Sequence, residues 1–295
     1  MKNFFQKQTT AVSLICIIIF TILGICFWVF FTPTKTEAPV VITKPKNATP
    51  IHTVIGQSVQ GRNIDSYRYG NGKTHIVLVG GIHGGYEWNT VVLAYKFVDY
   101  FDANPEIIPA NLTVTIIPDA NPDGVFKVTG TSGRIATADV STNTQVLSSG
   151  RFNANNVDLN RNFDYNWQPK STWQTKTVSA GTAPFSEPET QVLRDFLLKD
   201  NQSVAVFWHS QSGSIYASQG KDGILPETIN TMNAYAKASG YPAVKTFDAY
   251  ATTGGADDWL ASVNLPAFTV ELKTHNTIDW QENLAGVLAL FEYYK

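Results

Sequence analysis

The chain has 295 residues, of which 43% are hydrophobic and 16% are charged, a globular composition with enough apolar material for a sizeable core. Its net charge of −2 at pH 7 argues against a nucleic-acid-binding protein, which would carry a basic balance. The only cysteines, Cys16 and Cys26, lie in an apolar stretch near the N-terminus, so the rest of the chain cannot form a disulfide.

Residues 11–31 are almost entirely apolar and uncharged, which is long enough for a membrane-spanning helix. The short basic segment 1–10 would also suit a signal peptide, but the apolar run exceeds the usual length and no small-residue cleavage site follows it. We therefore predict an uncleaved transmembrane signal anchor, with a cleaved and secreted form as the alternative. Residues 32–50, rich in Pro, Thr and Lys, are predicted to be a linker to one folded domain at 51–295.

From residue 51 onward, apolar runs that favour strands alternate with helical patterns, which predicts one α/β domain. An opening hairpin is expected within 52–69, with its turn at Gly56-Gln57 or at Gly61-Arg62. The polar segment 128–156 shows little periodicity, and an unstructured segment of that length inside a domain is usually functional. The other expected elements are a strand at 76–79, a helix at 88–101, a strand at 112–117 followed by turn formers at 118–124, a helix from a capping box at 186–189 to about 198, a strand at 204–208, a helix at 225–239, a helix start near 257, a strand at 267–272 and a helix from about 280.

Residues 80–89 (Gly-Gly-Ile-His-Gly-Gly-Tyr-Glu-Trp-Asn) connect a buried strand to a helix. His83 and Glu87 therefore lie at the carboxyl end of a strand, where open α/β sheets bind ligands, and a histidine nitrogen with a carboxylate oxygen suits zinc. An ordinary loop histidine and a glutamate favoured by the helix dipole would fit the same residues. His209 follows a second buried strand; a lone histidine there is more often structural, but it supplies a second nitrogen for the same site.

Two further segments carry charge in unusual surroundings. Arg151 and Arg161 stand among asparagines in 151–163, which suits recognition of an anion or of a developing oxyanion, although a polar loop bonded to its own backbone is the alternative. Glu271 interrupts the apolar strand at 267–272. Because a buried carboxylate is costly unless it is paired or functional, Glu271 is a candidate catalytic base.

Together these segments resemble the zinc carboxypeptidase family of metallopeptidases, the carboxypeptidase A-like group, over essentially the whole of residues 51–295. Each motif is weak alone, but seven occur in the family's order. They are the His-Glu junction, Asn-Pro-Asp-Gly, an arginine followed by Val-Asp-Leu-Asn-Arg-Asn-Phe, Pro-Phe-Ser-Glu-Pro-Glu-Thr, His-Ser, Tyr…Gly-Gly…Asp-Trp, and Phe-Thr-Val-Glu-Leu. The resemblance implies a single α/β domain with a central mixed, mostly parallel twisted sheet flanked by helices.

The resemblance also implies a role for each matched residue. One Zn²⁺ per chain would be held by three ligands, with the fourth position left to water: His83, Glu87 and His209. Glu271 matches the general base, and Arg151 matches the arginine that stabilises the oxyanion. The residues that match binding of a substrate's terminal carboxylate are Asn160, Arg161 and Tyr250, and the residue that matches orientation of the first histidine is Asp158.

One departure from the family concerns the spacing of the first two ligands. Three residues separate His83 from Glu87, where the family usually has two, and we expect the glycine pair between them to absorb the extra residue. A second feature concerns specificity, because in the family the position before the Asp-Trp pair lies at the base of the pocket for the terminal side chain. Here it is Asp257, which would favour a cationic side chain; the alternative is that Asp257 caps the helix of Trp259.

We therefore predict a membrane-anchored, extracytoplasmic zinc metallocarboxypeptidase with a monomeric catalytic domain, whose partner is a peptide with a free C-terminal carboxylate. Asp257 would favour basic or diaminopimelate-containing cell-wall peptides. A zinc amidase or deacylase of a small acylated amino acid is one alternative, because its substrate would offer a carboxylate to Arg161 and Tyr250 as well. The other is a non-catalytic peptide-binding module on the same fold, which the complete set of ligands, base and oxyanion arginine disfavours.

Overall fold

The structure is a computed structural model that describes residues 50–199 and 202–295. The predicted basic N-terminal segment, the membrane anchor and all but the last residue of the linker lie outside the described residues and remain predictions. Within the described part, no helix is both long and apolar enough to span a bilayer.

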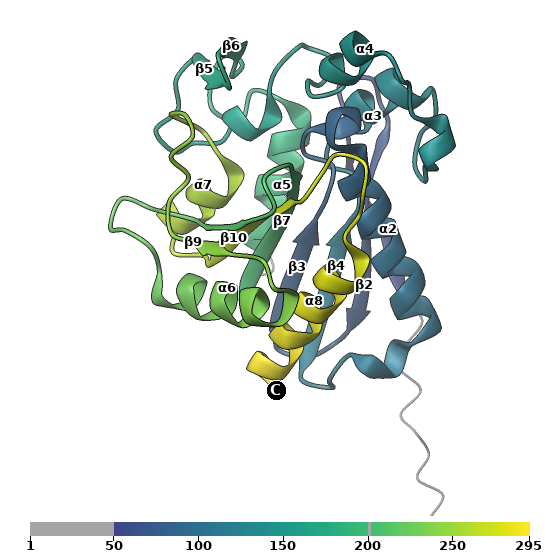
Figure 1. Cartoon of the computed structure of the whole chain (residues 1–295), viewed down its shortest axis with the longest axis vertical. Helices are drawn as coiled ribbons and strands as arrows, with labels where there is room; N and C mark the ends of the chain where they lie inside the picture. Colours follow the sequence, from purple (N-terminus) through teal and green to yellow (C-terminus); the bar gives the residue numbers. More distant parts are fainter. Residues whose placement is uncertain (1–49, 200–201) are drawn as a thin grey trace, which may run out of the picture. The chain divides into compact units, whose positions relative to one another are not determined.

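An eight-stranded mixed sheet forms the centre of the described domain (Figure 1). Its spatial order is β1-β2-β4-β3-β7-β10-β8-β9. The strands are β1 (Ile51–Gln57), β2 (Asn63–Gly70), β3 (Thr74–Val79), β4 (Leu112–Ile117), β7 (Val204–Ser210), β8 (Ile215–Ala217), β9 (Ala243–Val244) and β10 (Ala267–Leu272). The four central strands β4, β3, β7 and β10 are parallel, whereas β1-β2, β2-β4 and β10-β8 pair antiparallel. The predicted mixed sheet with a parallel centre is thus confirmed.

Helices cover both faces of this sheet (Figure 1). On one face lie α2 (Trp88–Ala103), α6 (Pro226–Ser239) and α8 (Trp280–Tyr294), and on the other lie α5 (Pro188–Lys199) and α7 (Ala256–Ser262). The shorter elements are η1 (Gly84–Glu87), η2 (Pro105–Ile107), α3 (Pro122–Thr129), η3 (Thr137–Asp139), α4 (Thr144–Ser149), η4 (Leu159–Arg161) and the two-stranded β5 (Lys170–Trp173) with β6 (Lys176–Ser179). The central strands are buried on both faces, and for this reason their sequences are nearly continuous apolar runs.

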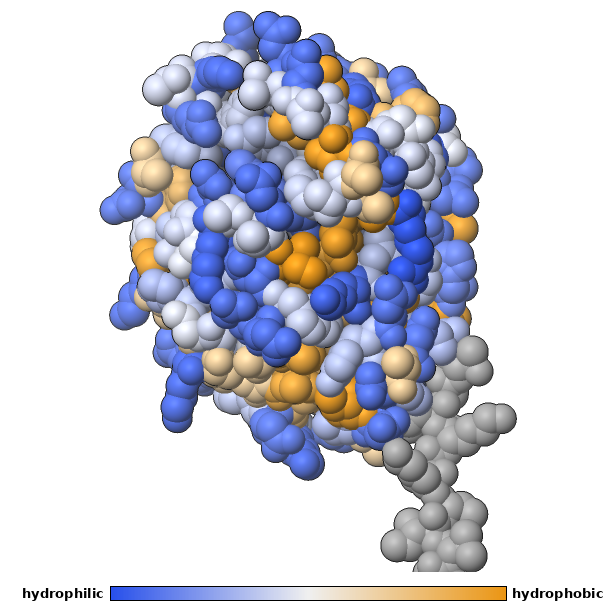
Figure 2. All heavy atoms as spheres, turned by 45° about the vertical axis from the view of Figure 1, so that its right-hand side comes forward, coloured by the Kyte–Doolittle hydropathy of each residue, from blue (hydrophilic) through white to orange (hydrophobic). Residues whose placement is uncertain are grey.

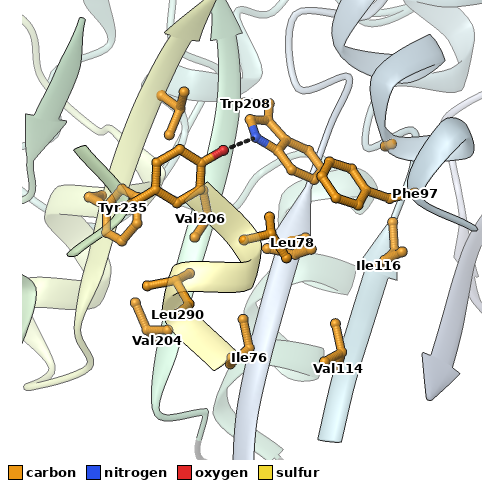
Figure 3. Packing of buried hydrophobic residues seen from close by; sticks show 14 of the residues in the cluster. Ile76, Leu78, Phe97, Val114, Ile116, Val204, Val206, Trp208, Tyr235 and Leu290 are labelled. Carbon is orange, nitrogen blue, oxygen red and sulfur yellow. Dashed lines mark hydrogen bonds between the residues drawn. The ribbon is translucent and has the colours of Figure 1, made fainter. Parts of the chain in front are cut away.

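The larger core cluster fixes the strand end that carries one predicted metal ligand (Figure 3). Trp208, the residue before His209, stacks on Phe97 of α2 with ring centroids 5.1 Å apart. Its indole Nε1 donates to the hydroxyl of Tyr235 on α6 at 3.4 Å. Gly286 of α8 permits this packing, because a Cβ there would lie 2.3 Å from the Tyr235 ring. Burying such rings stabilises the fold by roughly 2–3 kcal/mol each.

The surface of the domain is mainly polar. Figure 2 shows a largely hydrophilic face on which hydrophobic residues gather in patches between charged ones. Large hydrophobic side chains that are exposed in the described residues are spread over several elements, for example Ile51 and Val54 on β1, Phe126 on α3 and Val263 after α7. Nothing in this distribution tests the predicted monomeric state, which remains a prediction.

One open alternative is decided by the structure, and three details differ from the sequence expectations. The opening hairpin turns through Ser58–Arg62 with Gly61 at φ 74°, so the second of the two proposed turns is correct. The turn formers after β4 begin helix α3, because the Asn121 side chain caps it by accepting from the Gly124 N–H. The segment 128–156 contains η3 and α4 as well as loops. The hairpin β5-β6 was not expected at all.

The start of α5 also differs from a simple capping box. The Ser186 hydroxyl donates to Glu187 Oε1 at 2.7 Å and accepts from the Asn162 side-chain amide at 3.0 Å. The Asn162 Oδ1 in turn accepts from the Glu187 N–H and from the Thr190 hydroxyl. The first turn of α5 is therefore held by an asparagine of the polar segment 151–163, which ties this helix to the region of the predicted site.

Candidate metal centre and active-site cavity

Three buried side chains converge at the carboxyl ends of β3 and β7. His83 Nδ1 lies 2.8 Å from Glu87 Oε1, His209 Nδ1 lies 3.0 Å from Glu87 Oε2, and the two Nδ1 atoms are 3.1 Å apart. All three residues are at most 4% exposed. Two imidazole nitrogens and a carboxylate within 4.8 Å of one another form the donor set that zinc prefers, and the residues present therefore fit the metal that the sequence predicts.

Asp158 and Arg151 surround this cluster. Asp158 Oδ1 lies 3.3 Å from His83 Nε2, the nitrogen turned away from the other ligands, which is where a carboxylate that orients a metal-binding histidine belongs. Asp158 Oδ2 accepts from Arg151 Nε at 2.8 Å, and Arg151 Nη1 lies 3.7 Å from Glu87 Oε1. The structure thus places both residues where the resemblance put them, beside the ligands and in contact with each other.

The glycine pair between the first two ligands accommodates the extra residue. Gly84 has φ 47°, in the left-handed region, and begins the turn η1. A Cβ on Gly84 would lie 2.6 Å from the Gly150 carbonyl oxygen, and a Cβ on Gly85 would lie 2.5 Å from the Val128 Cβ. Because Gly150 directly precedes Arg151, this close contact joins the ligand-bearing loop to the segment of the oxyanion arginine.

The charges in the cluster stabilise one another. Burial opposes ionisation of Glu87, but the two histidines outweigh it and lower the pKa of this carboxyl. Burial likewise opposes ionisation of Asp158, and the arginines Arg151 and Arg161 outweigh it and lower the pKa of Asp158. Burial lowers the pKa of His209, which keeps its ring neutral and able to offer a lone pair to a metal.

Glu271 lies on β10 directly opposite His209 of the parallel neighbour β7. Its Oε2 is buried and has no hydrogen-bond partner among the described residues, whereas both carboxylate oxygens of Glu87 have partners. Burial, and then the negative charge of Glu87, raise the pKa of Glu271, while Arg151 lowers it. A carboxyl with a raised pKa and a free oxygen next to a metal cluster is placed to accept a proton from a reacting water.

A cavity of about 500 Å³ opens above the cluster and contains the other predicted site residues. Arg161 is 3% exposed; its Nε and Nη2 donate to the Thr172 carbonyl, and its Nη1 donates to the Asn160 carbonyl. Three of the five N–H groups of this guanidinium are thus fixed by backbone, which holds its plane in one orientation. Burial raises the pKa of Tyr250, so its hydroxyl is a protonated donor at neutral pH. Asn160 lines the same cavity and accepts from the Ala256 N–H.

Asp257 also lines the cavity and accepts from the Thr269 hydroxyl at 3.0 Å. The N-cap of α7 is Gly255, and no side-chain capping bond occurs there, so the helix-capping alternative for Asp257 does not match the geometry. The neighbouring Asp258 accepts from the Gln219 N–H, and burial followed by the charge of Asp257 raises its pKa to about 7. The cavity lining therefore contains a pair of adjacent carboxyls, those of Asp257 and Asp258.

Sequence reasoning missed two contributors to the cavity. Trp173, on the unexpected β5-β6 hairpin, lies against the Arg151 guanidinium with 4.7 Å between Cζ and the ring centroid. His275, in the loop after β10, also lines the cavity. Its position four residues after Glu271 was the one available signal, whereas the role of Trp173 depends on a hairpin with no clear strand pattern.

The parallel-centred fold, the buried donor cluster and the free carboxyl beside it define a metal-dependent hydrolase. A family model described as zinc carboxypeptidase matches residues 41–284, and the chain belongs to this family of zinc metallopeptidases. The recognition of the family from sequence and its zinc requirement are thereby confirmed.

The relatives of this chain carry the names of different peptidases. The chain is 29% identical over 242 residues to a gamma-D-glutamyl-L-diamino acid endopeptidase of Lysinibacillus sphaericus, a match over 75% of this chain and 60% of that protein. It is 28% identical over 242 residues to carboxypeptidase B of Astacus astacus, over 74% of this chain and 78% of that protein. The match thus spans about three fifths of the length of the bacterial relative.

Solved structures agree on the fold. Carboxypeptidase A of Helicoverpa armigera superposes with a TM-score of 0.63 at 21% identity, over 83% of this chain and 69% of that one. The murein-tripeptide amidase of Escherichia coli O157 superposes with a TM-score of 0.58 at 21% identity, over 85% of this chain and 93% of that one.

Proposed function

We propose that this zinc hydrolase is a metallocarboxypeptidase that removes a C-terminal residue with a cationic side chain from peptides. The observation that carries the proposal is the composition of the cavity: Arg161 and Tyr250 offer donors for a terminal carboxylate, and Asp257 adds a carboxylate in the same cavity. A free carboxylate and a nearby positive charge are together the mark of a basic C-terminal residue.

Each part of the reaction has a residue placed for it. When bound by His83, Glu87 and His209, zinc would lower the pKa of a water molecule and polarise the scissile carbonyl. Glu271 accepts the proton of the attacking water and delivers it to the leaving amine as the C–N bond breaks. Arg151, held by Asp158, donates N–H groups to the oxygen that gains negative charge.

Cell-wall peptides are the substrate class that we favour. Diaminopimelate carries an ammonium group at the end of its side chain, as lysine does, and this group could pair with Asp257 although a second carboxylate lies beside it. The relative named gamma-D-glutamyl-L-diamino acid endopeptidase supports a diamino acid residue in the substrate. We also propose that the domain acts outside the cytoplasm, tethered by the apolar segment 11–31. Recovery of the full-length protein in the soluble cytoplasmic fraction would contradict the tether.

A zinc amidase is the second candidate, because a murein peptide amidase A of Escherichia coli K12 is 31% identical over 131 residues, 41% of this chain. Both activities use the same metal and the same base, so only an assay with different substrates can distinguish the two activities. Release of free lysine or diaminopimelate from the C-terminus of a peptide library indicates a carboxypeptidase. Release of a larger peptide fragment from murein peptides, with C-terminal lysine left intact, indicates the amidase.

The direct test uses purified residues 45–295, with metal content measured before a mixed peptide library is assayed for released residues. We expect one zinc per chain and release of basic C-terminal residues. Glu271→Gln should retain zinc and lose hydrolysis by about 1000-fold or more, because the base is removed and the ligands are kept. Stoichiometric zinc with no hydrolysis by the wild type would favour the binding module, and a fully active Glu271→Gln variant would refute the mechanism.

A further inference from the structure

His275 occupies a defined place on one wall of the cavity, in the loop between β10 and α8. Its Nδ1 lies 2.8 Å from the hydroxyl oxygen of Ser210, and its ring lies 4.7 Å from the ring of Tyr86. The Tyr86 ring also packs edge-to-face against the ring of Trp173, with 5.0 Å between the two ring centroids. His275 is thus fixed by a hydrogen bond on one nitrogen and by ring packing, while the mechanism above gives it no role.

The hydrogen bonds around Ser210 determine which nitrogen of His275 carries the proton. The Asn89 side-chain amide donates to two backbone carbonyls, those of Thr274 and Thr277, so its Oδ1 is an acceptor. The Ser210 hydroxyl donates its only proton to this Oδ1 at 3.0 Å. Ser210 must therefore accept from His275, whose Nδ1 carries a hydrogen.

The other nitrogen of His275 is consequently a hydrogen-bond acceptor. Burial lowers the pKa of His275 although Glu87 opposes the effect, so the ring is neutral at pH 7. In a neutral imidazole protonated at Nδ1, Nε2 offers a lone pair. No hydrogen-bond partner for Nε2 occurs among the described residues. The His275 side chain is partly buried and lines the cavity. The wall thus presents a single acceptor of fixed direction to whatever fills the cavity.

Other parts of the cavity account for the carboxyl end of a substrate. Asn160, Arg161 and Tyr250 match the groups that receive its terminal carboxylate, and Asp257 faces its side chain. His275 makes its ring contacts and hydrogen bonds with a different set of residues, those around Tyr86 and Ser210. With the terminal carboxylate and the last side chain assigned to other residues, a peptide has one set of hydrogen-bond donors left to offer His275. These are the backbone N–H groups on the amino side of the scissile bond.

We propose that His275 is a substrate-positioning residue whose Nε2 accepts a hydrogen bond from a backbone N–H upstream of the scissile peptide bond. The inference rests on the proposed carboxypeptidase function and deepens it. It predicts that the enzyme recognises the backbone of a peptide upstream of the scissile bond, which a single acylated amino acid does not offer. Asn89 and Ser210 fix the acceptor, and Tyr86 holds the plane of the ring.

The test couples a change in the enzyme to a change in the substrate. The full-length zinc-loaded protein in detergent is assayed on N-acetyl-trialanyl-lysine and on three analogues, each N-methylated at one alanine nitrogen. We expect methylation at one position to lower kcat/KM of the wild type about 10-fold, since a hydrogen bond to a neutral group is worth about 1.4 kcal/mol. His275→Phe keeps the ring beside Tyr86, and we expect it to lose about 10-fold on the parent peptide, mainly in KM, and to be insensitive to that methylation.

Two further variants separate positioning from folding. His275→Gln, whose amide can offer an acceptor oxygen, should regain part of the lost kcat/KM. The matched control is His52→Phe, because His52 on the edge strand β1 also bonds a polar partner, Asp65, and stacks on a tyrosine, Tyr67. The control should behave as wild type. Zinc content and thermal midpoint are measured for every variant.

The outcomes distinguish the two proposals. A wild-type enzyme that cleaves the parent peptide but is indifferent to N-methylation at all three upstream positions would overturn the role of His275, even if the His275 variants failed to fold. The same holds if His275→Phe retains the full methylation penalty at every position. A wild type that cleaves neither the parent nor any analogue would instead overturn the proposed carboxypeptidase function, and the role of His275 with it.

Discussion

The metal side of the cavity consists of buried charged groups that contact one another, whereas the side that would receive the end of a substrate is more open and is carried by loops. His83, Glu87 and His209 are each at most 4% exposed and are held by strand ends and by Asp158. Tyr250 and Asp257 are only partly buried, in and after the loop that follows β9. The difference indicates that the chemistry is fixed by the core of the fold, while the choice of substrate depends on residues that can change without disturbing it.

Loss of a metal ligand should break the metal side most completely. His209→Ala removes one of three donors and leaves Glu87 with only one histidine, so bound zinc should fall well below one per chain and hydrolysis should fall about 1000-fold or more. Metal analysis and rates on a C-terminal lysine peptide measure both effects. A variant with full zinc and an undiminished rate would remove His209 from the ligand set.

Arg151→Lys tests the oxyanion group without removing its charge. Lysine keeps a cation beside Asp158 but loses the planar fork of the guanidinium, so kcat should fall about 100-fold while zinc content stays at one per chain. Steady-state kinetics with metal analysis separate the two quantities. An equal loss of zinc and rate would mean that Arg151 acts only by supporting the ligands.

Asp257→Ile should affect only the open side. Without this carboxylate, kcat/KM for C-terminal lysine should fall about 10- to 100-fold and that for C-terminal leucine should rise, since a cationic side chain loses its partner. Competition between the two peptides measures the switch. Asp222→Ala, at an exposed aspartate paired only with Lys221, is the matched control and should leave the preference unchanged.

The smallest effect on hydrolysis is expected at Asp119, beneath the ligand loop, where the change lies in the pH dependence of stability. Burial raises the pKa of Asp119 to about 8, and its Oδ2 is buried without a partner among the described residues. The folded state therefore holds a proton that the unfolded chain releases near pH 4, so this group lowers stability progressively from about pH 4 to pH 8.

Asp119→Asn keeps the size of the side chain and removes this titration. Relative to wild type, the variant should gain about 4 kcal/mol in the free energy of unfolding between pH 5 and pH 8.5, because about three pH units separate pH 5 from the folded-state pKa at about 1.4 kcal/mol each. Urea unfolding of the zinc-loaded proteins at the two pH values measures the gain. Parallel pH profiles for the two proteins would show that Asp119 is ionised in the folded state.

The sequence predicted the parts of the fold whose signal is local. The central strands β3, β4, β7 and β10 appear as apolar runs because both of their faces are buried, and the ligands at their ends follow from that placement. Helix α3 was obscured because its first residues, Asn-Pro-Asp-Gly, also form turns; the Asn121 side chain decides in favour of a helix. The residues of β5 show no strand pattern, since its place is determined by Arg151 and Arg161 far from it in sequence.

The site was predictable to the extent that its residues occur in recognisable order. The metal ligands converge as expected because His83 and Glu87 come shortly after β3 and His209 lies near the end of β7 in the same sheet. His275 could not be interpreted from sequence, because its tautomer depends on Ser210 and on Asn89, which lie 65 and 186 positions away. Contacts over such separations have no pattern in the chain, and only the folded structure shows them.

The contact of Gly84 and Gly85 with Gly150 and Val128 has a consequence for how this enzyme can be altered. The loop that bears the first ligands and the segment that leads into Arg151 meet backbone to backbone, with no space for a side chain between them. A methyl group added to Gly84 would therefore press on the Gly150 carbonyl and disturb the zinc ligand and the oxyanion donor in one step, whereas one added to Gly85 would press on Val128 of α3. Metal affinity and turnover are thus expected to change together at this contact, whereas a change at Asp257 should alter specificity alone.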